Sequence, residues 1–523
     1  MTPYSPSLSS RCICALFILA LAGHAGAAVW IGPVGNVALT NPNAISPADD
    51  AFGVAVAVGD YNGDDIDDVA VADRQNPNVV RVFLATAWDI GEPVFTPFTM
   101  QTVAVPMVSG TTQGPPVALV AGNFTRDITG DDELVVGVPG DSMTNNNAGA
   151  VFVLDRRPEG HWVVSNTIRQ GFEGYGGSSE VDDNFGASLA VGRFDQNDLD
   201  DLAIGVPGET TNGQASSGMA YVVYQGIVGL MNDSEEGFYR GVNGLTGTPE
   251  AGEQIGFALA AGDFDGDAID DLAVGIPGAS CAGFANSGSV MVLRGRNDTG
   301  GLDAAGVSYW SQTQAGVADD CEAGDRFGQA LVAGEFSATP IGEESTDDLA
   351  VGVPLERIDG VAGAGAVAVL YGSPGGGVTA VGNRLIHEGA LPGGSLQPAG
   401  FGLRLASGRI NEGAGTRDSL VVASPLANEG GASSAGRIWV IPNSGGNLAP
   451  ARAGKLVLGP AYALAPAAAS DLFGAQIAVG DFNGDGDNDL AVGVPGHDDD
   501  AQNTGGVQLM FQSGFIFVDD FED

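Results

Sequence analysis

Three short stretches of the chain place oxygen-bearing side chains at alternate positions, an arrangement suited to holding a metal ion. In each, side-chain oxygens stand at positions 1, 3, 5 and 9, and a backbone carbonyl is available at position 7. Calcium prefers roughly six to eight oxygen ligands in a flexible shell, so these turns predict structural calcium sites. The predicted ligands are Asp60, Asn62, Asp64, the carbonyl of Ile66 and Asp68; Asp263, Asp265, Asp267, the carbonyl of Ile269 and Asp271; and Asp481, Asn483, Asp485, the carbonyl of Asp487 and Asp489.

The alternative interpretation is an acidic hairpin that binds nothing, which is common for a single Asp-rich turn. Three copies at equivalent positions of a repeat favour metal binding. A related turn has Arg193 at position 1 but keeps Asp195, Asn197 and Asp201, and the guanidinium can replace the cation by pairing with these acids. The turns at 123–133, 335–348 and 409–419 are longer or poorer in acids. We therefore expect three filled sites, with the Arg193 turn as the only further candidate.

These turns belong to a unit that recurs along the chain. Each turn follows an apolar stretch ending in glycine, and these glycines are separated by 63, 70, 70, 72, 74 and 72 residues. They are Gly59, Gly122, Gly192, Gly262, Gly334, Gly408 and Gly480. A near-constant period indicates repeated structural units packed side by side.

Each unit is expected to contain four short strands. In the fourth unit these are residues 256–264, 272–276, 289–294 and 307–312. Four strands per unit are typical of a propeller blade, and no stretch shows the periodicity of helical repeats. The recurring Phe-Gly pair suits a ring between blades and a glycine where inner strands crowd the axis. We predict an all-β, seven-bladed β-propeller closed by pairing of the chain ends, with residues 29–37 completing the last blade.

The order of Phe-Gly, acidic turn and Gly-x-Pro resembles the FG-GAP repeats of integrin α-subunit propellers and their bacterial relatives. The clearest copies begin at Phe52, Ile255 and Phe473. The resemblance covers nearly the whole chain after its first 27 residues. It implies a seven-bladed propeller, calcium in some turns, and binding rather than catalysis.

The N-terminal segment predicts export. Residues 1–27 combine Arg11, a short apolar run and an A-x-A site, which is typical of a cleaved secretory signal and too short for a membrane anchor. Residues 28–513 would form the propeller, and 514–523 a tail that is either a last strand or a sorting tag. Cys281 and Cys321 would then be the only cysteines of the exported protein, where an oxidising environment favours a disulfide.

Charge and motifs limit the function. With 65 acidic and 20 basic residues the net charge is −45, which disfavours nucleic acid and anionic lipid as partners, and no later stretch could span a membrane. No nucleophile elbow, zinc motif or phosphate loop is present. Two functions remain: an extracellular binding, adhesion or scaffold module, or a polysaccharide-acting propeller enzyme. Because the acids recur around the ring and do not converge, we favour a non-enzymatic module that binds a protein or glycan. Its predicted binding loops are 208–217, 278–287, 355–363, 426–435 and 496–504.

Overall fold

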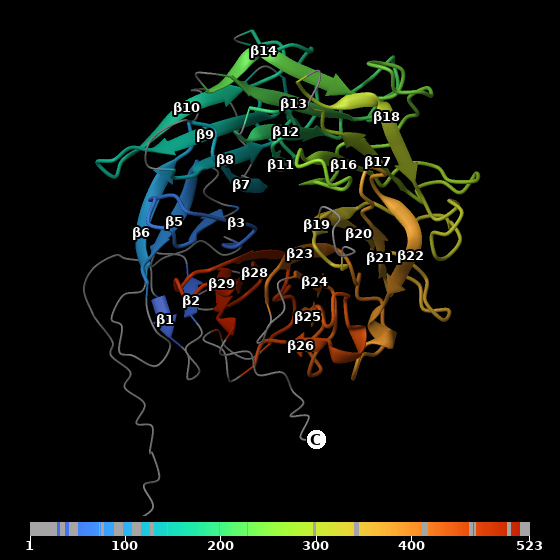
Figure 1. Cartoon of the computed structure of the whole chain (residues 1–523). Helices are drawn as coiled ribbons and strands as arrows, with labels where there is room; N and C mark the ends of the chain where they lie inside the picture. Colours follow the sequence, from blue (N-terminus) through green and yellow to red (C-terminus); the bar gives the residue numbers. More distant parts are fainter. Residues whose placement is uncertain are drawn as a thin grey trace, which may run out of the picture.

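Seven antiparallel sheets stand around a common axis in this computed structural model (Figure 1). Six sheets contain four strands, and the seventh contains five. Neighbouring strands in each blade follow one another in sequence, except where the chain ends meet. The predicted seven-bladed all-β propeller is confirmed.

The structure describes most of the chain after residue 28. The described residues are 29–31, 37–40, 51–72, 74, 78–87, 98–106, 117–125, 130–143, 145–172, 174–197, 199–226, 229–296, 300–338, 345–410, 417–459, 464, 467–498 and 504–512. The predicted signal segment 1–27 and tail 514–523 lie outside them.

The first three blades are formed in chain order. Blade 1 comprises β3 (Ala55–Gly59), β4 (Asp68–Ala72), β5 (Val79–Ala85) and β6 (Phe98–Ala104). Blade 2 comprises β7 (Ala118–Gly122), β8 (Glu133–Val138), β9 (Ala150–Arg156) and β10 (Trp162–Ile168). Blade 3 comprises β11 (Ser188–Gly192), β12 (Asp201–Val206), β13 (Met219–Gly226) and β14 (Gly229–Phe238).

The next three blades repeat this order. Blade 4 comprises β15 (Leu259–Gly262), β16 (Asp271–Ile276), β17 (Ser289–Arg294) and β18 (Asp303–Trp310). Blade 5 comprises β19 (Ala330–Gly334), β20 (Asp348–Val353), β21 (Ala366–Tyr371) and β22 (Thr379–Ile386). Blade 6 comprises β23 (Arg404–Gly408), β24 (Ser419–Ser424), β25 (Arg437–Ile441) and β26 (Gly454–Leu456). The helical elements of the described residues are two single turns, η1 (Glu388–Ala390) and η2 (Pro450–Arg452).

Blade 7 is built from both ends of the chain. It comprises β27 (Gln476–Gly480), β28 (Asp489–Val494), β29 (Gly506–Met510), β2 (Val37–Thr40) and β1 (Val29–Ile31). Figure 1 shows the blue β1 and β2 beside the red β29. The predicted single closing strand at 29–37 is therefore wrong in detail: β2 pairs with β29, and β1 adds outside it. The sequence has Pro33 within the predicted range, and proline cannot donate to a strand ladder. Residues 32–36 lie outside the described ones.

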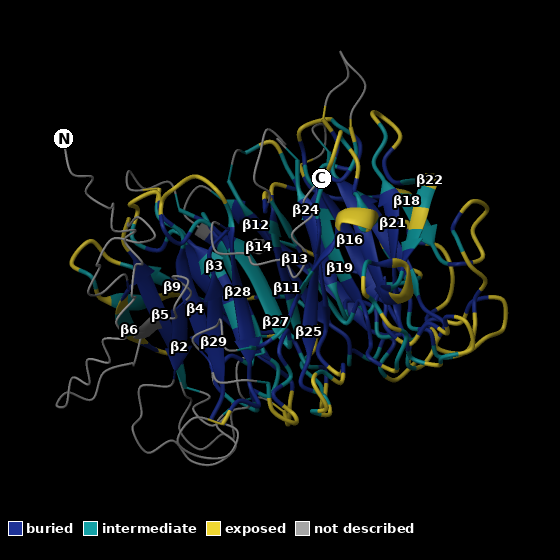
Figure 2. Cartoon of the chain, turned by 90° about the horizontal axis from the view of Figure 1, so that it is seen from below, coloured by how far each residue is buried: buried dark blue, intermediate teal, exposed yellow. Residues whose placement is uncertain are grey.

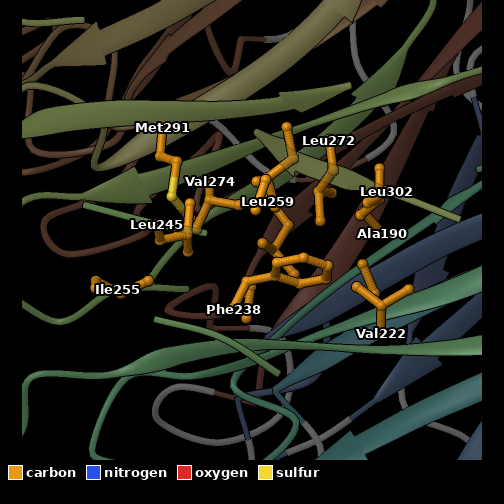
Figure 3. Packing of buried hydrophobic residues seen from close by; sticks show 14 of the residues in the cluster. Ala190, Val222, Phe238, Leu245, Ile255, Leu259, Leu272, Val274, Met291 and Leu302 are labelled. Carbon is orange, nitrogen blue, oxygen red and sulfur yellow. The ribbon is translucent and has the colours of Figure 1, made fainter. Parts of the chain in front are cut away.

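The hydrophobic core is divided among the gaps between blades. One cluster packs blade 3 against blade 4 and contains Phe238, Ile255, Leu259 and Met291 (Figure 3). Equivalent clusters lie between the other neighbours, and the aromatic ring of each Phe-Gly pair is buried in one of them. Phe185, for example, is fully buried and meets Tyr221 edge-on at 5.5 Å between ring centroids. The predicted role of the rings in filling the inter-blade gap is confirmed.

Glycine permits two different close approaches between blades. The glycine that ends an inner strand faces the next inner strand, since a Cβ on Gly59 would lie 2.3 Å from the Cβ of Ala121. The glycine of the Phe-Gly pair contacts the second strand of the preceding blade instead of the axis. A Cβ on Gly205 would lie 2.0 Å from the carbonyl oxygen of Gly256, whose φ is +84°. Side chains at these positions would separate the blades.

Burial follows the strands, and exposure is concentrated in the connections at the two ends of the blades (Figure 2). Second strands such as β12 and β16 are buried along their whole length. The connections carry turns and loops whose side chains are free to vary, which is where recognition is usually placed. Among the described residues, no helix has the length and apolar character needed to cross a membrane.

Candidate metal sites in the acidic turns

The three predicted turns occupy equivalent places in blades 1, 4 and 7. Each connects the inner strand to the second strand: β3 to β4, β15 to β16 and β27 to β28. Because equivalent strands run in the same direction around the axis, the turns share one face of the propeller, called here the turn face. The loops joining second to third strands lie on the other face, called the loop face.

The first aspartate organises each turn through backbone hydrogen bonds. In blade 1, Asp60 Oδ1 accepts the N–H groups of Asn62, Gly63 and Asp64 at 3.3, 2.7 and 3.1 Å, and Oδ2 accepts that of Asp65 at 2.8 Å. Asp263 and Asp481 accept corresponding bonds in their own turns. Gly63, Gly266 and Gly484 have φ of +72°, +75° and +75°, so glycine permits the bend as expected. The three turns thus have one geometry.

The ninth residue of each turn is a buried anchor. One oxygen of Asp68 accepts the N–H of Tyr61 at 3.1 Å, and the other accepts that of Ala85 at 2.6 Å. Asp271 and Asp489 accept equivalent bonds from their own blades. Burial raises the pKa of each of these three carboxyls to about 8. The ninth residue therefore connects the turn to the third strand.

The remaining predicted ligands are brought together to different degrees. In blade 4, oxygens of Asp263, Asp265 and Asp267 lie within 4.8 Å of one another. Position 3 is an asparagine in the other two turns, where Asn62 donates to Asp68 and Asn483 donates to Asp485. At position 7, the N–H groups of the three residues are hydrogen-bonded to the position 5 carboxylates. These pairs are Ile66 with Asp64, Ile269 with Asp267, and Asp487 with Asp485.

Arg294, at the end of β17, is a neighbour that the sequence did not reveal. Its Nη1 lies 3.2 Å from Asp265 Oδ2, and its side chain is one-third exposed. Burial raises the pKa of Asp265, while Arg294 acts in the opposite direction. The other oxygen, Asp265 Oδ1, is buried and has no hydrogen-bond partner within the described part of the chain. A hard cation would satisfy this oxygen, so the residues present fit calcium.

The Arg193 turn of blade 3 differs from its prediction. The Arg193 side chain is exposed and forms no ion pair with Asp195 or Asp201 among the residues described here. Its backbone N–H instead donates to Asp270 of blade 4 at 2.8 Å. Replacement of the cation by pairing of this guanidinium with the acids of its own turn is therefore not observed.

A ring of hydrogen bonds between blades was missed at the sequence level. In each blade, the side chain of the residue just before the anchor accepts the backbone N–H of the first turn residue of the preceding blade. The backbone N–H of the residue before the anchor in turn donates to the carbonyl of that first turn residue. We call this the junction ring. Its seven donor–acceptor pairs are Asp60–Asp132, Asn123–Asp200, Arg193–Asp270, Asp263–Asp347, Glu335–Asp418, Arg409–Asn488 and Asp481–Asp67. The only sequence feature that indicated the junction ring was the acidic residue that recurs just before the anchor.

On the loop face, the structure pairs Cys281 with Cys321, whose Cα atoms lie 6.2 Å apart. Cys281 follows β16 of blade 4, and Cys321 precedes β19 of blade 5. The pair joins the loop of one blade to the segment that leads into the first strand of the next. This leading segment is called here the entrance of a blade. In the chain-entropy model, closing a loop of 40 residues contributes about 4 kcal/mol to the free energy of unfolding.

Comparison with known proteins agrees with this geometry. Residues 185–223, 255–293 and 473–510 match the FG-GAP repeat. The matched segments begin at the Phe-Gly position of blades 3, 4 and 7 and run into the third strand. Two of the three contain a predicted calcium turn, and the third contains the Arg193 turn.

The chain is also similar to parts of larger proteins. It is 29% identical over 258 residues to integrin alpha-PS2 of Drosophila melanogaster, covering 48% of this chain and 16% of that protein. It is 25% identical over 312 residues to integrin alpha-5 of Xenopus laevis, covering 58% of this chain and 26% of that protein. It is 29% identical over 180 residues to human phosphatidylinositol-glycan-specific phospholipase D, covering 34% of this chain and 19% of that protein.

The matched part of the chain thus spans about a quarter or less of these relatives' length. Fold, repeat and similarity nevertheless agree with one another. The chain is an integrin-like β-propeller that carries FG-GAP repeats.

Proposed function

We propose that this protein is a secreted, calcium-binding FG-GAP propeller that acts as a non-enzymatic extracellular binding, adhesion or scaffold module. One observation supports this proposal above the others. Three turns with one geometry lie on the turn face, where calcium would support the scaffold, and the longer loops lie on the opposite face. A binding module requires a stable scaffold and an accessible recognition surface, and we assign the first to the turn face and the second to the loop face.

Calcium would be held by the acidic turns of blades 1, 4 and 7. The predicted donors are all hard oxygens, as calcium prefers, and three carboxylates converge in blade 4. Without a cation, the carboxylates of a turn repel each other. The proposed role of calcium is therefore structural.

Calcium binding to these turns is expected to release protons near neutral pH. Burial raises the pKa of Asp68, Asp271 and Asp489 from 3.8 to about 8, so the ion-free protein holds protons on them at pH 7. Their contribution to the stability of the ion-free fold is greatest below pH 4 and declines as the pH rises through 8, because only the unfolded chain ionises them freely. A cation displaces these protons, so calcium affinity at each site should fall by roughly 50-fold between pH 8 and pH 6, because the ionised fraction of a carboxyl with a pKa of about 8 falls from about one half to about one hundredth. Calorimetry in buffers of different ionisation enthalpy checks this, and the absence of proton release would contradict it.

The loop face has the chemistry of a recognition surface. Six large hydrophobic side chains are exposed among the described residues. Three of them, Phe284, Leu355 and Leu426, lie in the predicted binding loops and are 44–48% exposed. Val181, at the entrance to blade 3, adds a fourth on the same face. Part of the predicted loop 496–504 lies outside the described residues. Exposed apolar side chains carried by several blades favour a protein or glycan surface as the ligand.

The triple substitution Phe284→Ser, Leu355→Ser and Leu426→Ser tests this surface. Capture of a ligand from the native extracellular medium should fall at least tenfold, while the melting temperature and calcium uptake stay nearly unchanged. Val381→Ser on the outer strand of blade 5 is the control, because Val381 is 81% exposed and lies away from the loops. Loss of capture in the control alone would place binding on the outer strands. Cleavage of a polysaccharide with turnover by the purified protein would favour the enzyme instead.

A further inference from the structure

A second group of acids lies on the loop face at the entrance to blade 5. Oxygens of Glu322, Asp325 and Glu356 all lie within 4.8 Å of one another. Asp325 and Glu356 are 2% and 1% exposed, whereas Glu322 is at the surface. Two buried carboxylates at this distance need a positive charge or a proton between them.

Gln312, which follows β18 of blade 4, completes the group. Its Nε2 donates to Glu356 Oε2 at 2.5 Å, so its amide lies against the carboxylates. Its Oε1 is buried in a side chain only 2% exposed, and has no hydrogen-bond partner among the described residues. A half-turn of the amide exchanges the positions of oxygen and nitrogen and directs the oxygen toward the acids. The group then consists of four oxygen donors.

The same four residue types recur at the entrance to blade 3. Gln170, Glu180, Asp183 and Glu209 occupy the positions of Gln312, Glu322, Asp325 and Glu356. Gln170 Nε2 donates to Glu209 Oε2 at 2.7 Å. Gln170 Oε1 and Asp183 Oδ1 are buried without a partner in the described chain. The four residue types and the unsatisfied glutamine oxygen recur in both blades, which indicates a built arrangement; the blade 5 group is the one whose three acids have oxygens within 4.8 Å of one another among the described residues.

The intervening blade shows what replaces this arrangement. At the entrance to blade 4, Arg240 stands in the place of the glutamine and Ala279 in the place of the second buried glutamate. Arg240 Nε lies 2.8 Å from Glu253, the buried acid that remains. Here the chain supplies the positive charge itself. At blade 5, by contrast, Arg357 is 55% exposed and lies 3.6 Å from the surface residue Glu322.

We propose that the entrances to blades 5 and 3 each bind a hard divalent cation, calcium by their all-oxygen donor set, on the face opposite the acidic turns. The cation takes the place that the Arg240 guanidinium occupies in blade 4. It links the outer strand of one blade, through the glutamine, to the second strand of the next. This proposal does not depend on calcium in the acidic turns.

An open hollow of about 640 Å³ borders the blade 5 group at Glu322, its surface member. Glu322 and Arg357 are among its lining residues, and Cys321, from the disulfide, lies beside them. The disulfide fixes the segment that carries Glu322. The alternative occupant is a proton shared between the buried acids, since burial raises the pKa of Glu356 to about 7.

Counting bound calcium by native mass spectrometry distinguishes the two occupants. Calcium alone is the probe, added to the intact exported protein. Glu356→Gln should lose one bound ion relative to wild type, and Glu209→Gln with Glu356→Gln should lose two. Asp320→Asn is the matched control, because it removes the same charge from an exposed position in the same segment and should lose none. Asp267→Ala, in an acidic turn, should lose the ion of that turn and keep the ions at the entrances of blades 3 and 5. The experiment therefore distinguishes an absence of calcium at the entrances from an absence of calcium in the acidic turns.

An unchanged ion count in the folded Glu356→Gln variant would overturn the proposal and assign the site to a proton. If Glu356→Gln does not fold, the surface variant Glu322→Gln replaces it. Replacement of this carboxylate ligand by a neutral amide should weaken calcium binding to one site at least tenfold without affecting folding. Equal affinity of all sites in Glu322→Gln and wild type would likewise overturn the proposal.

Discussion

Removal of calcium by a chelator is expected to lower the melting temperature of the protein by on the order of 10 °C. An ion that binds only the folded state stabilises it by about 2.7 kcal/mol at a free concentration 100 times its dissociation constant. Three turn sites would then contribute about 8 kcal/mol. For a chain of this size, each kcal/mol corresponds to roughly 1–2 °C. Differential scanning calorimetry with and without calcium measures the effect.

A single turn can be isolated with Asp267→Ala, because Asp267 is exposed and its loss leaves no cavity. Up to a third of the calcium-dependent shift, the share of one of the three sites, should disappear, and Asp265→Ala with Asp267→Ala should remove that full third. Glu159→Ala is the control, since this acid is 75% exposed and belongs to none of the acidic turns. Calorimetry that detects neither heat of calcium binding nor a change in melting temperature would refute the calcium sites in the turns.

The second large effect is expected at the closure of the ring. Leu39 is fully buried in β2 and is paired with Val507 of β29. Leu39→Asp would place a charge in the cluster between blades 7 and 1, and should lower the free energy of unfolding by about 4 kcal/mol or more. Urea denaturation measures the loss, and faster hydrogen exchange in β29 would locate it at the closure.

Two further variants make this result specific. Leu39→Met conserves volume and should cost less than about 1.5 kcal/mol. Val381→Asp introduces the same charge on an exposed strand and should change stability by about 0.5 kcal/mol or less. Equal stability of Leu39→Asp and Val381→Asp would show that β2 does not hold the ring closed.

Local patterns in the sequence were sufficient for the repeat and for most strands. The third strand of blade 4 was predicted with its observed bounds, Ser289–Arg294. The inner strand is shorter than predicted, Leu259–Gly262, because Gly256 at φ +84° belongs to a turn that contacts the preceding blade. The outer strand, Asp303–Trp310, starts earlier than predicted and pairs through a bulge. Strand bounds failed where contacts with another blade decide the backbone conformation.

The candidate sites also divide into features set by neighbouring residues, which the sequence predicts, and features set by contacts between distant residues, which it does not. Asp60, Asp263 and Asp481 could be recognised because the residues that they organise are their own neighbours in sequence. The contact of Arg294 with Asp265 crosses 29 residues, and the Gln312–Glu356 bond crosses 44. Neither contact is accompanied by a local sequence pattern that would predict it. The closing strand pairs with a segment about 470 residues away, so its register depended on the fold as a whole.

The junction ring has a consequence for how such a protein can change in evolution. Each bond takes its donor from one repeat and its acceptor from the next, and every repeat supplies one of each. Duplication or deletion of one whole repeat leaves every remaining donor facing an acceptor of the same kind. A gene rearrangement that cuts within a repeat leaves one unmatched pair. The ring thus favours inheritance of the blade as a single unit, and the bond made by Arg193 shows that the connection between blades does not require an acid at the first turn position.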